Sequence, residues 1–285
     1  MTRSTWLHLR IPFSFFLLPV FLFAWSIAPH VVWWRAVSVG LILHFFLYPA
    51  SNGYNSYFDK DENSIGGLKH PPKVIRELYW VSLVLDAIAL IWGFFLSWQF
   101  ALMLLVYGLV SKAYSHPAIR LKKMPYIGWL AAGVFQGYVT FLMTYVGLHG
   151  LGLGETFVQE IQIPAILSTV LLFGSYPMTQ VYQHEEDGKR GDETISRKLG
   201  ILGTFHFTAI AFSIASAGFF WYYQTYLHTM SAIGFLMVLT PVLAYFSWWY
   251  LKVRKDRAEA SFTHTMRLNL LSSLMLNLWF GAMLL

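Results

Sequence analysis

The sequence contains no cysteine and few charged residues. Only 12% of its 285 residues are Asp, Glu, Lys or Arg, whereas a soluble domain carries about 25%. The lack of cysteine excludes disulfides, thiolate metal sites and thiol catalysis. The scarcity of charge, together with a mean hydropathy of +0.52, excludes a soluble enzyme, a disordered chain and a nucleic-acid-binding protein, although the isoelectric point is near 9.4.

Long apolar segments take the place of the missing charge, since 56% of the residues are hydrophobic. A helix needs about 20 mostly apolar residues to cross a bilayer. The sequence therefore predicts an all-α fold, a polytopic bundle of nine transmembrane helices that forms a single transmembrane domain over residues 1–285. The expected spans are roughly 11–29, 31–51, 77–97, 99–115, 127–147, 162–182, 204–226, 231–251 and 267–285.

The positive charges are distributed unevenly between the expected connections. All Lys and Arg residues except Arg35 lie before the first span or after the second, fourth, sixth and eighth spans. Because Lys and Arg favour the cytoplasmic side, we expect a multi-pass protein of the cell or inner membrane. Its N-terminus is predicted to be cytoplasmic and its C-terminus to lie outside.

Two matching polar stripes follow the second and sixth spans. Each stripe has the spacing i, i+3, i+7, which places its members on one face of a helix. Amide and carboxylate oxygens are ligands that suit Mg²⁺, which usually takes one or two carboxylates together with substrate phosphates and water. The alternative is that the stripes only solvate helix ends. The stripes consist of Asn52, Asn55 and Asp59, and of Gln180, Gln183 and Asp187.

Basic side chains in the same connections are candidates for holding a phosphate beside the metal, because carboxylates alone would repel it. The alternative for each is a role in topology only, since cytoplasmic Lys and Arg set orientation whatever the function. The main candidates for diphosphate binding are Lys69, Arg120, Lys122 and Lys189, and Lys73 and Arg190 are further candidates in the same connections.

One carboxylate, Asp86, lies near the middle of the third expected span. Ionisable residues inside the membrane are functional candidates by default. The alternative is a protonated or paired structural residue that faces another helix.

Three motifs resemble those of the UbiA-type intramembrane prenyltransferases, and the resemblance covers nearly the whole chain. Asn55-Ser-Tyr-Phe-Asp59 is similar to the first Asp-rich motif. Tyr114-Ser-His-Pro117-Ala-Ile-Arg120-Leu-Lys122 resembles the Tyr-x-x-Pro segment, and in this form it is closest to chlorophyll synthases. The run from Asp187 to Gly200 is similar to the second Asp-rich motif and its Thr…Leu-Gly tail.

The sequence departs from the family pattern at several motif positions. Asn52, Asn55 and Gln183 stand where the family often has Asp, and Asp59 and Asp187 remain. The resemblance therefore implies that Asp59 and Asp187 are the central catalytic carboxylates. Nearby residues that could compensate or support the site are Asp61, Glu186, Tyr114 and Asp86.

The resemblance also implies the chemistry, which is Mg²⁺-dependent transfer of a polyprenyl group from a prenyl diphosphate to an acceptor within the bilayer. Cytoplasmic loops would cap a central cavity, and aromatic side chains could stabilise an allylic cation. The acceptor is expected to be aromatic, as in quinone or pigment biosynthesis. The alternatives are a non-aromatic lipid or carotenoid acceptor, or a non-catalytic protein that binds or transports lipids.

Overall fold

The computed structural model describes residues 1–150 and 152–285, and their regular structure is helical apart from one β-bridge between Ile65 and Leu68. The expectation of an all-α fold is therefore confirmed. The first half of the chain comprises α1 (Arg3–Leu9), η1 (Ile11–Phe16), α2 (Leu18–Ser26), α3 (Trp33–Leu41), η2 (Ile42–Leu47), α4 (Tyr48–Asp59), α5 (Glu77–Leu96), α6 (Trp98–Ser115), η3 (Leu121–Lys123), α7 (Pro125–Val134), η4 (Phe135–Val139) and α8 (Thr140–His149). The second half comprises η5 (Leu153–Thr156), α9 (Gln159–Met178), α10 (His184–Arg190), α11 (Ile195–Tyr226), α12 (Thr229–Lys255), η6 (Arg257–Glu259) and α13 (Phe262–Ala282).

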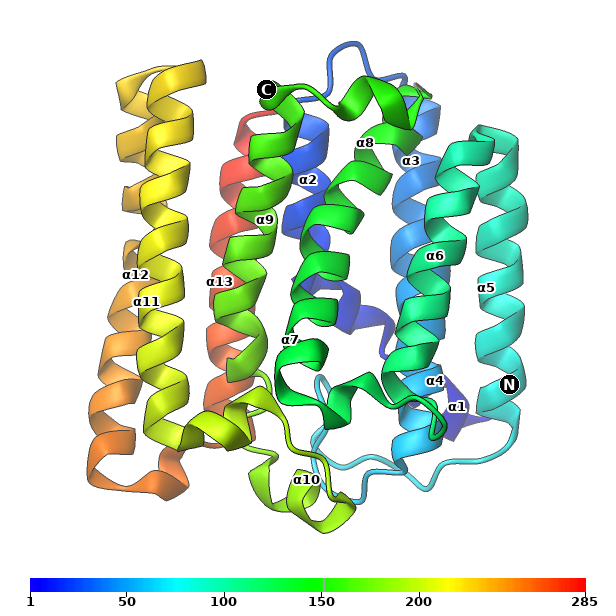
Figure 1. Ribbon diagram of the computed structural model, residues 1–285, viewed down its shortest axis with the longest axis vertical. Coiled ribbons are helices and arrows are strands. Elements are labelled where there is room, and N and C mark those ends of the chain that lie inside the picture. Colours follow the sequence, from blue (N-terminus) through cyan, green and yellow to red (C-terminus); the bar gives the residue numbers. More distant parts are fainter. Residues whose placement is uncertain (151) are drawn as a thin grey trace.

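The long helices run side by side along one axis and form a bundle (Figure 1). The short helix α10 and the end of α4 lie at the lower end of the bundle in this view. We call this the charged end, because most of the buried ion pairs described below are found there. The C-terminus lies at the opposite end of the bundle from α10.

Among the described residues, five helical segments are long and apolar enough to cross a membrane, and a sixth is counted if a bent pair forms one span. The bent pair joins residues 3–16 to residues 18–27 at an angle of 43°. The predicted count of nine spans is not confirmed by this criterion, because α6 and α13 and the helix from α3 to α4 carry polar residues within their length. The five segments are Glu77–Leu96, Pro125–His149, Gln159–Met178, Ile195–Tyr226 and Thr229–Lys255.

Two long helices each contain a π-helical turn. The turn η2 interrupts the helix that runs from α3 into α4, and η4 interrupts the helix that runs from α7 into α8. Such turns are rare and occur often at functional sites. Here each turn lies in the middle of a helix that borders the cavity described below.

The predicted continuation of the sixth span to residue 182 is wrong. Helix α9 ends at Met178, and a turn separates it from α10, which begins at His184. Beyond Met178 the backbone N–H groups of Thr179 and Gln180 donate to carbonyls three residues back instead of four, so the chain forms turns and the α-helix ends. Gln180, Gln183 and Asp187 therefore do not form one helical stripe, whereas Asn52, Asn55 and Asp59 all lie in α4 as predicted.

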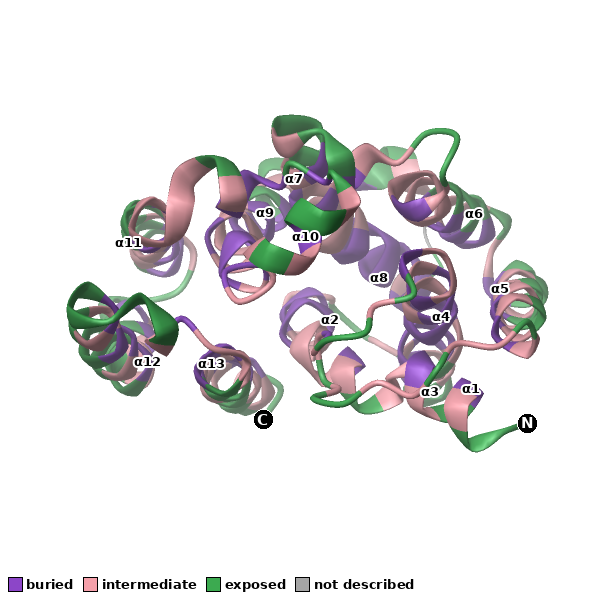
Figure 2. Ribbon diagram, turned by 90° about the horizontal axis from the view of Figure 1, so that it is seen from below, coloured by how far each residue is buried: buried purple, intermediate pink, exposed green. Residues whose placement is uncertain are grey.

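Aromatic side chains pack the helices together on the side away from the charged end. Phe23 of α2 stacks on Phe280 of α13, with ring centroids 4.5 Å apart, and it also meets Phe141 and Phe219. Figure 2, seen from the charged end, shows buried residues on the inward faces of the helices and exposed residues on the outer faces of α5 and α12. This distribution suits a bundle whose perimeter is surrounded by lipid.

Candidate functional site

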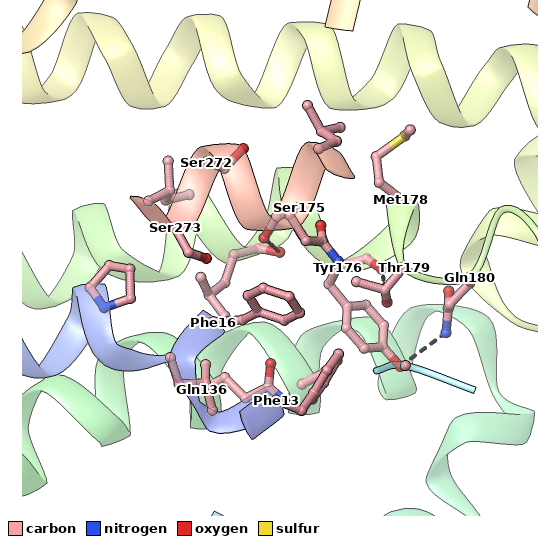
Figure 3. Close-up of a pocket in the computed structure, with 18 of the residues that line it drawn as sticks. Phe13, Phe16, Gln136, Ser175, Tyr176, Met178, Thr179, Gln180, Ser272 and Ser273 are labelled. Atoms are coloured by element: carbon pink, nitrogen blue, oxygen red, sulfur yellow. Dashed lines mark hydrogen bonds between the residues drawn. The ribbon is translucent and has the colours of Figure 1, made fainter. Parts of the chain in front are cut away.

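A cavity of about 970 Å³ opens between the helices and extends from the charged end into the bundle. Its charged lining residues are Arg10, Asp59, Asp61, Lys122, Asp187 and Arg190. Beyond them the wall is mainly apolar and aromatic, and Figure 3 shows Phe13, Phe16 and Tyr176 around this part of the cavity. The cavity thus joins a charged chamber to an apolar one.

Asp59 lies at the last position of α4, where it meets two cations from the loop after α6. The Lys122 ammonium is 2.5 Å from Asp59 Oδ1, and Arg120 Nη2 is 3.6 Å from the same oxygen. Both Asp59 and Lys122 are buried. Because a buried charge is costly unless it is paired, this contact joins α4 firmly to the loop between α6 and α7.

Asp192 is fully buried and receives two parallel hydrogen bonds from one guanidinium. Arg120 Nε and Nη2 donate to its two oxygens at 2.7 and 2.9 Å. Burial raises the pKa of Asp192, but the hydrogen bonds from Arg120 and the charges of Lys122 and Arg120 outweigh it and lower this pKa. A bidentate pair of this kind holds both side chains in a fixed orientation.

Arg190 of α10 connects the two predicted motifs. It is paired with Asp61, which follows α4, and its Nη2 donates to Asp187 Oδ1 at 3.0 Å. Burial raises the pKa of Asp187 to about 6 despite the neighbouring charges of Arg190 and Lys122. Burial also raises the pKa of Asp61, although Arg190 opposes the effect. Four carboxylates and four cations at the charged end form what we call the charge network: Asp59, Asp61, Asp187, Asp192, Arg10, Arg120, Lys122 and Arg190.

Arg10 is the cation that reaches the cavity from the N-terminal segment. It adopts a left-handed backbone conformation with φ of 48°, between α1 and η1. Its guanidinium donates to the carbonyl oxygens of Gly66 at 3.1 Å and Asn52 at 3.3 Å. Arg10 therefore ties the connection between α4 and α5 to the middle of α4.

Four amide side chains at the charged end use their N–H groups in protein contacts and keep their oxygens free. Asn55 donates to Ser115 Oγ at 2.7 Å, and Gln183 donates to the Ser64 carbonyl at 3.2 Å. Among the described residues, no hydrogen bond to the amide oxygen is found for any of the four, and the oxygen of Gln180 is also buried. The four amides are Asn52, Asn55, Gln180 and Gln183.

These oxygens, together with the carboxylates beside them, form a donor set of the kind that Mg²⁺ accepts. Within the described residues, no group of three or more His, Cys, Asp or Glu side chains is close enough to hold a metal by itself. A metal at this end would therefore depend on amide oxygens and on oxygens from a substrate. An uncharged amide oxygen holds Mg²⁺ less strongly than a carboxylate does.

Most of the residues singled out from the sequence lie around the same chamber. Those that line the cavity are Asn52, Asn55, Asp59, Asp61, Tyr114, Lys122, Gln183 and Asp187. Tyr114 is hydrogen-bonded to Tyr176, whose hydroxyl in turn accepts a hydrogen bond from Gln180 at 3.0 Å. Arg120 lies behind the cavity wall, where it holds Asp192.

Four other singled-out residues lie away from the cavity. Lys69 is exposed, and Lys189 is an exposed partner of Glu185 at 2.8 Å. Glu186 accepts a hydrogen bond from Asn63, and Asp86 is paired with Lys112 of the neighbouring helix α6. Two of the four predicted diphosphate contacts, Lys69 and Lys189, therefore lie outside the chamber.

Sequence reasoning assigned no site role to Arg10 or Asp192. Arg10 was interpreted only as a topological charge, because it immediately precedes an apolar run. Asp192 lies in the same loop as Asp187 and resembles a solvated loop acid in the sequence. Asp192 could have been recognised as the partner of Arg120, which has the opposite charge. That pairing requires knowing that two residues 72 positions apart in the chain are in contact.

The chain matches the model of the UbiA prenyltransferase family over residues 16–271. No curated protein matches it in sequence. Among solved structures, a UbiA homologue from Aeropyrum pernix K1 has a TM-score of 0.70 and 18% identity, with 100% of both chains covered. A UbiA homologue from Archaeoglobus fulgidus, described as bound to GPP and Mg²⁺, has a TM-score of 0.68 and 18% identity, covering 99% of this chain and 100% of that chain.

A structure described as that of digeranylgeranylglyceryl phosphate synthase also matches. It has a TM-score of 0.61 and 18% identity, and the match covers 99% of this chain and 98% of that one. At such identities the likeness concerns the fold. The helical arrangement described above is therefore shared by proteins whose sequences have diverged widely.

Proposed function

The chain belongs to the UbiA prenyltransferase family, and on this premise we propose that it transfers a polyprenyl group from a prenyl diphosphate to an acceptor inside the membrane. The observation that carries the proposal is the cavity itself, which joins a chamber of paired charges to an apolar chamber. A prenyl diphosphate has the same division, with an anionic head and a hydrocarbon tail.

The diphosphate would occupy the charged chamber. Lys122 and Arg190 line it and already hold the carboxylates of Asp59 and Asp187. Mg²⁺ would be held there by these two carboxylates with the amide oxygens of Asn55 and Gln183. When bound, it would neutralise the charge on the diphosphate oxygens and so make the diphosphate a better leaving group. The Archaeoglobus fulgidus homologue described as bound to GPP and Mg²⁺ supports this assignment.

The prenyl tail would extend along the apolar wall. Tyr48 and Tyr107 line this part of the cavity, with ring centroids 6.0 Å apart, and Phe16 lies nearby. Aromatic faces stabilise cations, so these rings are suited to the charge that develops when the allylic C–O bond breaks. Exposed apolar residues of α12 that line the cavity, such as Leu243, place one wall next to lipid.

The transfer step replaces one bond at the first prenyl carbon by another. The C–O bond to the diphosphate breaks, and the diphosphate leaves with the electron pair. A nucleophilic atom of the acceptor supplies the electron pair for the new bond and then loses a proton, which the released diphosphate accepts. The acceptor is expected to be aromatic, and a lipid alcohol is the alternative class.

Purified protein in lipid nanodiscs, supplied with geranyl, farnesyl and geranylgeranyl diphosphates and phenolic acceptors, tests this function. Diphosphate release and the prenylated product are measured with and without Mg²⁺. We expect both to require Mg²⁺ and an acceptor. Tight binding of the donor without any bond cleavage would contradict catalysis and would instead indicate a protein that binds or carries prenyl lipids.

A further inference from the structure

The cavity has a section that contains no charge. All six charged side chains that line the cavity among the described residues belong to the charged end, and the remaining lining residues are neutral. This neutral section is nevertheless not purely apolar. It includes amide and hydroxyl side chains from three different helical segments, and the reaction proposed above uses none of them.

Four of these polar residues form what we call the neutral belt: Gln136 of η4, Ser175 of α9, and Asn269 and Ser273 of α13. Gln136 and Ser273 each lie eleven residues beyond the start of a helix that begins at the charged end. At 1.5 Å per residue both are about 16 Å into the bundle. Figure 3 shows Phe16 between Gln136 on one side and Ser175 and Ser273 on the other.

The side chains of the neutral belt are largely free to bind a ligand. Among the described residues, Gln136, Asn269 and Ser273 have no side-chain hydrogen bond, and Ser175 has only a long contact of 3.5 Å to the Leu172 carbonyl. Ser273 is only 5% exposed. Polar groups inside a membrane protein are normally paired, because an unpaired group there is costly. A ligand with hydroxyl or carbonyl groups would supply the missing partners.

The π-helical turn that carries Gln136 is held in place by specific contacts. The Tyr138 N–H donates to Thr169 Oγ1 of α9 at 2.8 Å, and the Phe135 carbonyl accepts a hydrogen bond from Thr140 at 2.8 Å. A Cβ at Gly137 would lie 2.5 Å from the Thr169 Cα atom. The turn is therefore built into the packing of α7, α8 and α9, and it holds in place the backbone that carries Gln136.

The electrostatics of the cavity decide which ligand the neutral belt can take. The three cations that line the cavity are matched by three carboxylates, and the belt itself has no cation. A carboxylate or phosphate placed at the belt would remain buried without a partner, which is strongly unfavourable. An uncharged polar group would gain hydrogen bonds from Gln136 and Ser273 at little cost.

We propose that the neutral belt binds the prenyl acceptor, and that this acceptor is an uncharged, lipid-soluble molecule with hydroxyl or carbonyl groups. The proposal rests on the proposed function and adds the class of the second substrate. Gln136, Asn269 and Ser273 donate hydrogen bonds to these groups, and the acceptor lies between the belt and the donor's first prenyl carbon. Acceptors with a free carboxylate or phosphate are disfavoured.

The first test compares acceptors that differ only in charge. The pairs are 4-hydroxybenzyl alcohol with 4-hydroxybenzoate, and a glycerol monoalkyl ether with its phosphate. For at least one pair, we expect kcat/KM for the neutral member to be about tenfold or more above that for its anionic partner. The reason is that the anionic group would be buried at the belt without a partner of opposite charge. A preference for the anionic members overturns the proposal, and so does the failure of every acceptor to accelerate diphosphate release above the rate with donor alone.

The second test uses variants of the belt. Gln136→Leu and Ser273→Ala should each raise the KM for the neutral acceptor about tenfold, as the loss of one hydrogen bond predicts, and leave the KM for the donor unchanged. Gln136→Lys should shift the preference toward the anionic acceptors. Ser26→Ala is the control, since Ser26 lies outside the cavity and donates to its own helix at the Phe23 carbonyl.

Donor binding without acceptor, and Mg²⁺-dependent diphosphate release in the presence of an acceptor, separate the two proposals. If the wild-type protein and the belt variants release diphosphate but the acceptor KM is the same in all of them, the neutral belt is not the acceptor site and the proposed function stands. If the wild-type protein neither binds the donor nor releases diphosphate, the proposed function fails and the assignment of the belt fails with it.

Discussion

Asp59 and Asp187 are each held by a cation from another part of the chain. Lys122 pairs with Asp59, and Arg190 pairs with Asp187 as well as with Asp61. These contacts balance the charge of the buried carboxylates with cations of the protein itself. If Mg²⁺ and diphosphate bind here as proposed, the pairing would change, because Asp59 and Asp187 would then hold the metal and Lys122 and Arg190 the phosphate.

Removing either carboxylate charge should nearly abolish transfer. Asp59→Asn and Asp187→Asn keep the size of the side chain and its ability to form hydrogen bonds, but each leaves the metal with one ligand charge fewer. We expect turnover to fall about 100-fold or more, in the range found when one electrostatic stabiliser is lost, and excess Mg²⁺ to restore it only in part. The measurement is prenyl transfer as a function of Mg²⁺ concentration.

Asp256→Asn serves as the matched control, since Asp256 is exposed and only caps the short helix η6. Near wild-type turnover in both Asp59→Asn and Asp187→Asn would remove these two residues from the site.

The amides proposed to hold Mg²⁺ allow the opposite experiment. Asn55→Asp and Gln183→Asp add a carboxylate where the free amide oxygen now lies. Because a carboxylate binds Mg²⁺ more strongly than an amide, we expect the Mg²⁺ concentration for half-maximal turnover to be unchanged or lower in both variants. A clear increase in that concentration would show that the two amides do not face the metal.

Arg120 is expected to matter for folding because it holds a fully buried carboxylate. Arg120→Ala leaves Asp192 without its bidentate partner, and we expect a loss of about 3 kcal/mol in the free energy of unfolding, at the lower end for a broken buried pair. Lys122 at 3.5 Å still offers partial compensation.

Arg120→Lys should lose less stability than Arg120→Ala, since it keeps the charge but not the planar fork. The double variant Arg120→Ala/Asp192→Asn should also recover part of the loss. Thermal unfolding in detergent measures all three. Equal melting temperatures for wild type and Arg120→Ala would assign this residue to topology alone.

At the scale of elements, the π-helical turn η4 is important both for the close packing against α9 and for the position of Gln136, the residue proposed to bind the acceptor. The turn allows Gly137 to approach the backbone of α9, where an added Cβ would lie 2.5 Å from the Thr169 Cα atom and 2.6 Å from its nitrogen. Backbone atoms cannot move aside as a side chain does. The helices α7 and α9 therefore meet closely at this point only because the residue is glycine.

Gly137→Ala should separate the two helices and destabilise the protein by about 1–3 kcal/mol, as overpacking does. It should also displace the neighbouring Gln136 and raise the KM for the acceptor. Gly154→Ala is the control, because no atom lies within 4 Å of its added Cβ. Unfolding temperature and acceptor KM are measured for both variants, and identical values would show that the close approach is not required.

At the scale of the whole molecule, the uneven distribution of Lys and Arg predicts the orientation in the membrane. The charged end collects the basic connections that the sequence assigns to the cytoplasm, and the C-terminus lies at the other end of the bundle (Figure 1). The charge network therefore would face the cytoplasm, where soluble prenyl diphosphate heads and Mg²⁺ are available.

Reporter fusions test this orientation. A fusion after residue 285 should report an outside location, and fusions in the connections at 60–76, 116–124 and 256–261 should report a cytoplasmic one. A fusion at the outer connection 227–228 serves as the internal control for the opposite side. A cytoplasmic C-terminus would contradict the model of nine spans.

Prediction from the sequence was most accurate where local patterns are sufficient. The spacing of Asn52, Asn55 and Asp59 required only a helix, and α4 supplies it. The second stripe was predicted with the wrong secondary structure, because α9 ends at Met178 and Gln183 and Asp187 reach the cavity from a separate turn and short helix. Lys69 and Lys189 looked equivalent to Lys122 in the sequence, but only Lys122 lies in the chamber.

Composition and periodicity by themselves determined the class of this protein. Hydrophobic length dictates helices that cross a bilayer, because in lipid each backbone polar group must be satisfied within its own helix. Charge asymmetry predicts the orientation, and the motifs identify the family. These are properties of single segments, so they can be found without knowledge of how the segments pack.

Only the tertiary structure decided which side chains meet. The pairs of Arg120 with Asp192 and of Arg190 with Asp61 join residues 72 and 129 positions apart. The neutral belt likewise combines residues of η4, α9 and α13, which no local pattern connects. Such contacts depend on the packing of whole helices against one another, because burial and pairing are decided by neighbours in space and not by neighbours in the chain.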